Sequence, residues 1–292
     1  MIAINPKSDS DAVVDSAIAQ VGEIATLPEV TVKIIQIVEN PKSTARDLHD
    51  VIRNDPALSA RLLKVVNSAF YGLPGQISNI DRAIVLLGLS AVKNIAIAAS
   101  ITHLFNGGVP IEGFNGVQVW RHAIAVGVAS RLITAAQGKP ALEETFLAGL
   151  IHDLGLLVER QAFGKKIAEV IARQKASPGR FCDIERQIIG TDHQILGMAL
   201  AQKWRFPRHL CLTIGYHHRA KELAETNYEL PTMIHVADVL AARANLGFCN
   251  TAAHETYSDE ELEIIGSNPA DLEAVLAKLP EEVAVAESIF TE

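Results

Sequence analysis

The sequence predicts an all-α protein, a multi-helix bundle, and three observations support this prediction. Apolar residues recur at helical spacing along most of the chain. Residues that start or stop helices recur at short intervals. No run of alternating apolar and polar residues is long enough to predict a strand. We therefore expect an N-terminal helical half followed by a C-terminal helical half.

The composition is that of an acidic globular protein. The 292 residues are 49% hydrophobic, which is enough for the core of one large domain or two small ones. The formal net charge is −8. This acidity argues against a nucleic-acid-binding face, which needs clustered Lys and Arg.

No segment has the pattern of a membrane anchor or an export signal. The longest apolar stretch, residues 94–105, contains Asn94 and His103 and predicts a buried helix. Residues 1–11 lack the basic start and long apolar core of a signal peptide. The cysteines form no CxxC pair, so neither a disulfide framework nor a zinc ribbon is expected. We therefore expect a soluble, cytoplasmic protein.

In the N-terminal half, capping residues mark where successive helices begin. Thr44 and Asp47 have the spacing of a capping box. Asp55 followed by Pro56 supplies an N-cap and a first-turn proline. The helix that follows has one apolar face, made of Leu58, Leu62, Val65, Val66 and Ala69.

Two further helices are expected after a loop at residues 70–77. Ser78 is expected to cap the first, Gly88 to end it and Ser90 to start the second. The helix–glycine–helix rhythm is also typical of a helix-turn-helix. The second helix offers only Lys93 as a cation, however, so we do not expect DNA binding.

The second half begins after a hinge-like segment at residues 106–116. Helical patterns follow at residues 119–133, 143–158, 164–174, 183–189, 192–204, 207–218 and 231–247. The chain is thus predicted to contain a leader (1–17), an N-terminal helical half (18–108), a second helical half (109–250) and an acidic tail of short helices (251–292).

The second half carries histidines and aspartates inside otherwise apolar helical segments. A buried carboxylate usually pairs, protonates or binds a metal, because burying its charge alone is costly. Mixed imidazole and carboxylate ligands suit iron, manganese or zinc, and one carboxylate can bridge two ions. The candidate ligands of such a mononuclear or dinuclear centre are His122, His152, Asp153, His193, His217, His218 and Asp238.

Simpler structural roles stand beside this hypothesis. We expect His103 and His209 to be hydrogen-bonded core residues and Asp192 to be a helix N-cap. Asp238 could accept a hydrogen bond from the backbone or pair with a buried histidine. His235 lies three residues before Asp238, so it could be that partner or an alternative ligand.

The order of these residues resembles that of the HD superfamily of metal-dependent phosphohydrolases, whose signature is H…HD…D on an all-α fold. By motif, His122 resembles the first histidine, His152-Asp153 the doublet and Asp238 the final aspartate. His193 and the His217-His218 pair resemble the extra ligands of dinuclear members, which include the HD-GYP phosphodiesterases.

The N-terminal half resembles the HDOD family, a regulatory relative of those hydrolases. The resemblance covers about residues 20–245, and its most specific blocks are NDPALSARLLKVVNSAFYG (54–72) and ISNIDRAIVLLG (77–88). It implies an HDOD-type fold and a bacterial signal-transduction module, generally without hydrolase activity. Such a module would act on a signalling protein in trans, through the N-terminal helices and the loop at Phe70, Tyr71 and Gly72, although Phe70 could equally be a core residue.

The alternative is a metal-dependent phosphohydrolase that binds a phosphorylated or nucleotide ligand, with Asp153 as the catalytic candidate. Two departures from the HD-GYP pattern argue against it. Leu156 stands where hydrolytic members carry a lysine, and no Gly-Tyr-Pro motif follows His218. Hydrolysis of cyclic-di-GMP is therefore not expected, and the sequence does not indicate an oligomeric state.

Overall fold

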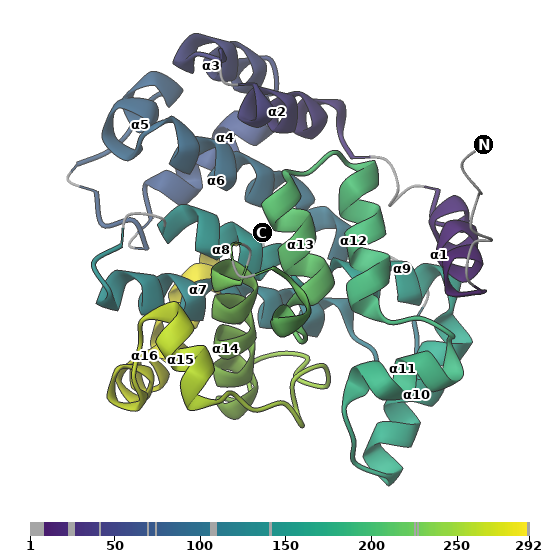
Figure 1. The fold of residues 1–292 in the computed structure, drawn as a ribbon. Helices are drawn as coiled ribbons and strands as arrows, with labels where there is room; N and C mark the ends of the chain where they lie inside the picture. Colours follow the sequence, from purple (N-terminus) through teal and green to yellow (C-terminus); the bar gives the residue numbers. More distant parts are fainter. Residues whose placement is uncertain are drawn as a thin grey trace.

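The computed structural model describes residues 9–22, 27–40, 42–68, 70–73, 75–105, 110–139, 142–224, 226 and 228–290. These residues are mostly helical (Figure 1). They contain no strand, only one isolated antiparallel bridge between Ile111 and Phe114. The prediction of an all-α fold is therefore confirmed.

The N-terminal half packs its helices into a layer at the top of Figure 1, except that the first helix lies apart from them. Its helices are α1 (Asp9–Gln20), α2 (Glu29–Glu39), α3 (Ala45–Arg53), α4 (Pro56–Val66), α5 (Ile80–Leu87), α6 (Leu89–Ile101) and the 3₁₀ helix η1 (Thr102–Phe105). The first of these, α1, contacts α9 and α12 of the other half.

The C-terminal half forms the middle and the bottom of the molecule in Figure 1. Its helices are α7 (Gly116–Ala136), α8 (Leu142–Ile151), α9 (Leu154–Ala162), α10 (Gly164–Ala176), α11 (Phe181–Ile188), α12 (His193–Lys203), α13 (Arg208–Tyr216), η2 (Ala220–Glu222), α14 (Glu229–Arg243), α15 (Asp259–Ile265) and α16 (Pro269–Phe290).

The predicted starts of α3 and α4 in the N-terminal half are confirmed. Thr44 and Asp47 form a reciprocal capping box, and the side chain of Asp55 caps α4, which begins at Pro56. The described part of the predicted apolar face of α4 is buried, namely Leu58, Leu62, Val65 and Val66. Ala69, the last residue of that predicted face, lies outside the described residues.

The boundaries of α5 and α6 differ by one residue from the prediction. The cap of α5 is Asn79 and not Ser78, because the Asn79 side chain accepts a hydrogen bond from the backbone N–H of Arg82 at 2.8 Å. Helix α6 begins at Leu89 directly after Gly88, whose φ of 87° suits glycine. Helix α6 is buried along most of its length and contacts α2, α4 and α8.

Helix α7 is the central element of the C-terminal half. It contacts α8, α14 and α16, and nearly all of its side chains from Val119 to Ser130 are buried. A helix that is apolar all round belongs in the interior. His122 is one of the polar exceptions on this helix, and its burial places an imidazole deep inside the protein.

The segment after residue 251 belongs to the core. Its last helix, α16, has 22 residues, whereas the sequence predicted short helices. Its buried face, with Leu272, Val275 and Leu279 among its residues, repeats every three or four residues and packs against α7. The Trp120 indole donates a hydrogen bond to the Phe290 carbonyl at 3.2 Å, which joins the two helices near their ends.

The loop after α4 does not offer Phe70 as an exposed anchor. The ring of Phe70 is buried and lies 5.3 Å from the ring of Phe146, measured between centroids. The Arg131 guanidinium stacks on Phe70 at 4.1 Å from its centroid. Phe70 is therefore a core residue, which is the second of the two roles that the sequence left open for it.

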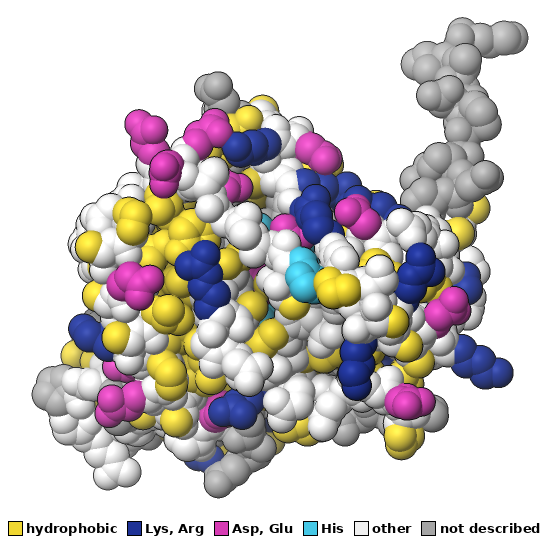
Figure 2. Space-filling model, turned by 90° about the horizontal axis from the view of Figure 1, so that it is seen from below, with side chains coloured by type: hydrophobic (Ala, Val, Ile, Leu, Met, Phe, Trp, Pro, Cys, Tyr) yellow, Lys and Arg dark blue, Asp and Glu magenta, His cyan; other side chains and the backbone are white. Residues whose placement is uncertain are grey.

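The surface in Figure 2 mixes both signs of charge. Lys and Arg side chains alternate with Asp and Glu side chains on this face, and neither sign forms a large continuous area. Among the described helices, none combines the length and the apolar composition needed to cross a membrane.

Glycine lets two helices that carry the polar cluster approach closely. A Cβ atom added at Gly155 in α9 would lie 1.8 Å from the backbone oxygen of His193, the first residue of α12. Backbone atoms cannot move aside as a flexible side chain can. Only glycine therefore permits this crossing, which sets the distance between the two helix starts.

We predict that Gly155→Ala lowers the free energy of unfolding by about 3 kcal/mol, because the added methyl group forces α9 and α12 apart. Urea unfolding followed by circular dichroism measures this change. The matched control is Gly22→Ala, since nothing lies within 4 Å of a Cβ atom there. Equal midpoints for Gly155→Ala and the wild type would contradict the close crossing.

Candidate metal centre

The structure brings all seven candidate ligands together in one buried cluster. Each of their side chains is at most 7% exposed, the largest value being that of His218. Five segments supply them, namely α7 (His122), the α8–α9 junction (His152 and Asp153), the start of α12 (His193), the end of α13 (His217 and His218) and the middle of α14 (Asp238).

Helix ends place most of these side chains. Helix α8 ends at Ile151 and α9 begins at Leu154, so His152 and Asp153 occupy the break between them. Asp153 precedes α9 but makes no side-chain capping bond, which leaves its carboxylate available to the cluster. His217 directly follows α13, as predicted, so the His217-His218 pair lies at a helix C-terminus that favours a cation.

Asp153 lies between two groups of histidines in the cluster. Its Oδ2 lies 3.3 Å from Nε2 of His152 and accepts a hydrogen bond from the Thr251 hydroxyl at 3.1 Å. Its Oδ1 faces the other way, 3.4 Å from Nε2 of His193 and 3.6 Å from Nε2 of His217. The two oxygens therefore serve two sets of histidines, which is the arrangement of a bridging carboxylate.

Asp238 closes the other side of the cluster. Its Oδ1 lies 2.8 Å from Nε2 of His122, and its Oδ2 lies 3.7 Å from Nε2 of His218. His235 and Asp238 form no hydrogen bond with each other among the described residues, and Nε2 of His235 lies 3.0 Å from the Thr256 carbonyl instead. Of the alternatives open from the sequence, pairing with a buried histidine is the one observed, and that histidine is His122.

Backbone carbonyl groups around the cluster hold three of the histidine rings in place. Nδ1 of each of these rings lies near a backbone carbonyl, which can only accept, so each Nδ1 carries the proton. These contacts are His122 to Leu246 at 3.1 Å, His152 to Gly149 at 2.7 Å and His217 to Ile214 at 2.9 Å. At His152 and His217 the Nε2 lone pair therefore points inward, which is the usual second-shell arrangement of metal-bound histidine, whereas Nε2 of His122 faces the Asp238 carboxylate at 2.8 Å.

Several buried atoms of the cluster have no hydrogen-bond partner among the described residues. Such atoms are costly in a protein interior unless a ligand or an ion satisfies them. They are Nε2 of His152, His193 and His217, both ring nitrogens of His218, Oδ1 of Asp153 and Oδ2 of Asp238. These nitrogen and oxygen donors fit a transition-metal ion, so the buried cluster could hold a metal.

The charge states of Asp153 and His217 suit a cation. At His122 and His193, by contrast, burial lowers the pKa, but the neighbouring carboxylates outweigh it and raise this pKa well above its usual value. Burial raises the pKa of Asp153, but the neighbouring His152 and His193 outweigh it and hold this pKa well below the usual value. Burial lowers the pKa of His217 to about 4, so its imidazole is neutral at physiological pH. A carboxylate that stays ionised beside a neutral imidazole is ready to coordinate metal without first losing a proton.

Sequence reasoning missed the residues that support the cluster. Glu185 in α11 holds Nδ1 of His193 at 2.8 Å, and Cys182, one turn earlier, lies 4.0 Å from the same nitrogen. Behind them, burial and the neighbouring Glu185 carboxylate raise the pKa of Glu159 well above its usual value. A signal was present, because Glu185 lies three residues after Cys182 and therefore on the same face of the predicted helix at 183–189.

The three structural roles assigned outside the cluster had mixed outcomes. Asp192 is the N-cap of α12, as predicted, and accepts a hydrogen bond from the backbone N–H of Ile195 at 2.9 Å. His209 is half exposed and pairs with Glu144 at 2.9 Å. His103 is exposed. The prediction that both histidines lie in the core was wrong, because each sits on the outward side of its helix.

A loop at residues 244–258, the covering loop, encloses the cluster. Besides the bond from Thr251 to Asp153, the amide of Asn250 donates to Gln174 at 2.9 Å. The backbone N–H of Phe248 donates to the Gln118 carbonyl at 2.8 Å. These bonds hold the loop against α7, α10 and the break between α8 and α9, beside the cluster.

The comparisons with known proteins place the chain in a family. The HDOD domain profile matches residues 24–220, and the chain belongs to the HDOD domain family. An uncharacterised protein of Treponema pallidum is 28% identical over 210 residues. That match covers 70% of this chain and 40% of the relative's length.

Solved structures share the fold at low sequence identity. An HDOD domain protein of unknown function from Geobacter sulfurreducens has a TM-score of 0.76 and 23% identity over 94% of this chain and 99% of its own. A protein of Marinobacter aquaeolei, provisionally named a signal-transduction protein, has a TM-score of 0.77 and 20% identity over 100% of this chain and 68% of its own. A protein of Shewanella amazonensis, provisionally named a phosphohydrolase, has a TM-score of 0.70 and 24% identity over 94% of this chain and 97% of its own.

We predict that Glu185→Gln weakens binding of Zn²⁺ by about tenfold to a hundredfold, because the His193 ring loses the carboxylate that orients it. Competition with a chromophoric chelator measures the affinity. Asp183→Asn on the same helix is the matched control, since this side chain is 50% exposed and pairs with Arg186. If both variants bind zinc like the wild type, Glu185 does not position a ligand.

Proposed function

We propose that this protein is a regulatory HDOD module that holds metal in its buried histidine and aspartate cluster and acts through contact with a signalling protein in trans. The observation that carries the proposal is the enclosure of a complete donor set. Seven candidate ligands converge, several of their inward atoms lack hydrogen-bond partners among the described residues, and the covering loop lies against them. The fold shared with a provisionally named signal-transduction protein agrees with this proposal.

The donor chemistry favours iron, manganese or zinc. Two ions are supported by the orientation of Asp153, whose two oxygens face different histidines. One ion would take donors from the set His122, His152, Asp153 and Asp238, the other from Asp153, His193, His217 and His218. When bound, such ions supply fixed positive charge beside the buried carboxylates of Asp153, Asp238 and Glu185.

The enclosure argues against a hydrolytic role. Catalytic metal sites keep one position open to water and substrate, whereas structural sites are closed. All seven side chains are nearly inaccessible here. Leu156, which stands in the place of a lysine in hydrolytic relatives, is also fully buried and offers no cation to a phosphate group.

A surface on the N-terminal half supports contact with a partner. Val85 and Leu86, near the end of α5, are 77% and 39% exposed. Leu86 also lines a cavity of about 590 Å³, where the start of α6 meets α8 and α13. Lys93 lines the same cavity, and burial lowers its pKa. Apolar side chains beside a lysine would suit a partner segment that presents an apolar residue and a carboxylate.

The second candidate is a metal-dependent phosphohydrolase, which the retention of the whole donor set favours. In that case the covering loop would open, and the metal would polarise a phosphoryl group and activate a water molecule. The fold is also shared with a protein provisionally named a phosphohydrolase. Activity is the property that separates the two candidates.

We predict that tag-free protein contains one or two equivalents of iron, manganese or zinc per chain by elemental analysis. Removing the metal should lower the stability by about 4 kcal/mol if the ion is normally present at a thousand times its dissociation constant. Asp153→Asn should lose the metal, whereas Asp259→Asn, an exposed control, should keep it. Wild-type protein without metal, and without a thermal shift on adding any of the three ions, would exclude a metal centre.

We predict that the metal-loaded protein does not hydrolyse bis(p-nitrophenyl) phosphate or cyclic dinucleotides faster than Asp153→Asn does, because the covering loop keeps phosphate groups away from the cluster. Release of p-nitrophenolate and chromatography of nucleotide products measure the two reactions. Turnover that disappears in Asp153→Asn would establish the phosphohydrolase instead.

A further inference from the structure

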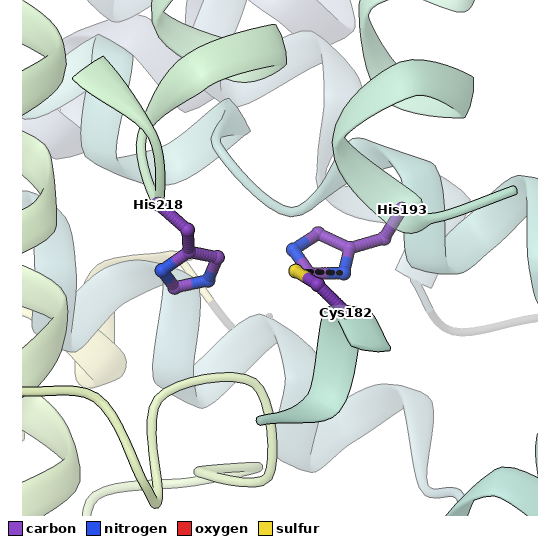
Figure 3. Close-up of side chains that lie close together, drawn as sticks. All are labelled: Cys182, His193 and His218. Carbon is purple, nitrogen blue, oxygen red and sulfur yellow. Dashed lines mark hydrogen bonds between the residues drawn. The ribbon is translucent and has the colours of Figure 1, made fainter. Parts of the chain in front are cut away.

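We propose that Cys182 is a thiolate ligand of the metal ion held by His193 and His218. This inference rests on the proposed metal centre and names a ligand outside the seven candidates. Figure 3 shows the Cys182 sulfur beside the His193 ring, with the His218 ring facing both. All three side chains are buried, and Cys182 is 1% exposed.

The donor atoms are close enough for one ion. One donor atom from each of the three residues lies within 4.8 Å of the others. Bond lengths of about 2.3 Å to sulfur and 2.0 Å to nitrogen place two donors of a tetrahedral ion roughly 3.5 Å apart. Small rotations of the three side chains would close the remaining distance.

His218 is the residue that requires a ligand. It is 93% buried, since 7% of its surface is exposed, yet neither of its ring nitrogens has a hydrogen-bond partner. A buried imidazole without any partner is costly. Nε2 of His193 also lacks a hydrogen-bond partner, because Glu185 holds only Nδ1. The Cys182 sulfur lies 4.0 Å from Nδ1 of the same His193 ring, so both histidines bring an unsatisfied nitrogen to the neighbourhood of this sulfur.

Gln194 couples the sulfur to His218. The backbone N–H of His218 can only donate, so the Gln194 atom that faces it at 3.1 Å is the amide oxygen. The amide nitrogen then points to the Cys182 sulfur and donates to it at 3.4 Å. A thiolate accepts such a bond better than a thiol does.

Arg180 fixes the other side of the His218 backbone. Its guanidinium donates to the His218 carbonyl at 3.1 Å, and Arg180 precedes Cys182 by two residues. The segment around the start of α11 therefore supplies both the candidate sulfur ligand and a contact that holds the histidine in place. This arrangement ties α11 to the end of α13 at the cluster.

Coordination by Cys182 would select the metal. As the ion binds, the S–H bond breaks, the proton leaves to solvent and a metal–sulfur bond forms, with no change in oxidation state. Thiolate is a soft donor that suits zinc, iron or cobalt and suits magnesium or manganese poorly. The site that contains Cys182 would therefore prefer Zn²⁺ to Mn²⁺.

Cobalt substitution tests the inference without relying on activity. Titrating metal-free protein with Co²⁺ should produce a sulfur-to-cobalt charge-transfer band in the near ultraviolet, together with visible bands from cobalt bound by nitrogen and oxygen. Cys182→Ser should lose the charge-transfer band and keep the visible bands. Its affinity for Zn²⁺ should fall by at least about tenfold, while its affinity for Mn²⁺ changes by less.

The other two cysteines provide matched controls. Cys211 donates to the Phe206 carbonyl at 3.4 Å and belongs to none of the groups of possible ligands among the described residues. Cys249 is the sharper control, because its sulfur lies 3.9 Å from Nδ1 of His122. Cys211→Ser and Cys249→Ser should both keep the charge-transfer band.

The outcomes separate this inference from the metal centre itself. Cobalt bound without a charge-transfer band, or a band lost only in Cys249→Ser, would overturn ligation by Cys182 and leave the metal centre standing. Failure to bind any cobalt would overturn both. X-ray absorption of the zinc-loaded wild type needs no variant, and a zinc–sulfur shell near ~2.3 Å is expected there. The lack of that shell would exclude the thiolate even if Cys182→Ser did not fold.

Discussion

The burial of two carboxylates, Asp153 and Asp238, is the constraint on which the rest of the C-terminal half depends. An ionised carboxylate in a protein interior is costly unless it is paired or bound to a metal. Each lies beside histidines, and these come from helices that are distant in the sequence. The need to surround these two charges therefore acts together with apolar packing, and both constrain the mutual positions of α7, α8, α12, α13 and α14.

This constraint links metal binding to the assembly of the fold. Because the candidate ligands come from five segments, a bound ion would join all of them and stabilise the C-terminal half as a unit. Helix α8 ends directly before His152 and also packs against α6 of the N-terminal half. A physical connection thus runs from the cluster to the exposed surface at the end of α5, through two helices in contact.

Much of the cluster is readable from the sequence, because its members interrupt apolar helical patterns. His152-Asp153 and Asp238 are conspicuous for that reason, and helix caps such as Thr44 and Asp55 are set by neighbouring residues. Cys182 and Glu185 were not predicted as members, since their roles depend on how α11 meets α12 after the turn at Gly190. The prediction that His209 lies in the core was wrong for a related reason. An apolar pattern shows which face of a helix is hydrophobic, but it does not show whether another helix covers a given residue.

The number of donors bears on the choice between a regulatory and a hydrolytic centre. A hydrolytic ion needs a position for water, so protein donors must leave its coordination incomplete. Here the cluster has seven buried side chains, and our proposal adds Cys182 as an eighth donor. The covering loop lies against this cluster and bonds to Asp153 through Thr251. Added donors fill positions that water would occupy. A thiolate also lowers the positive charge that would activate a water molecule. Ligation by Cys182 would therefore favour an ion that stabilises or signals over one that hydrolyses.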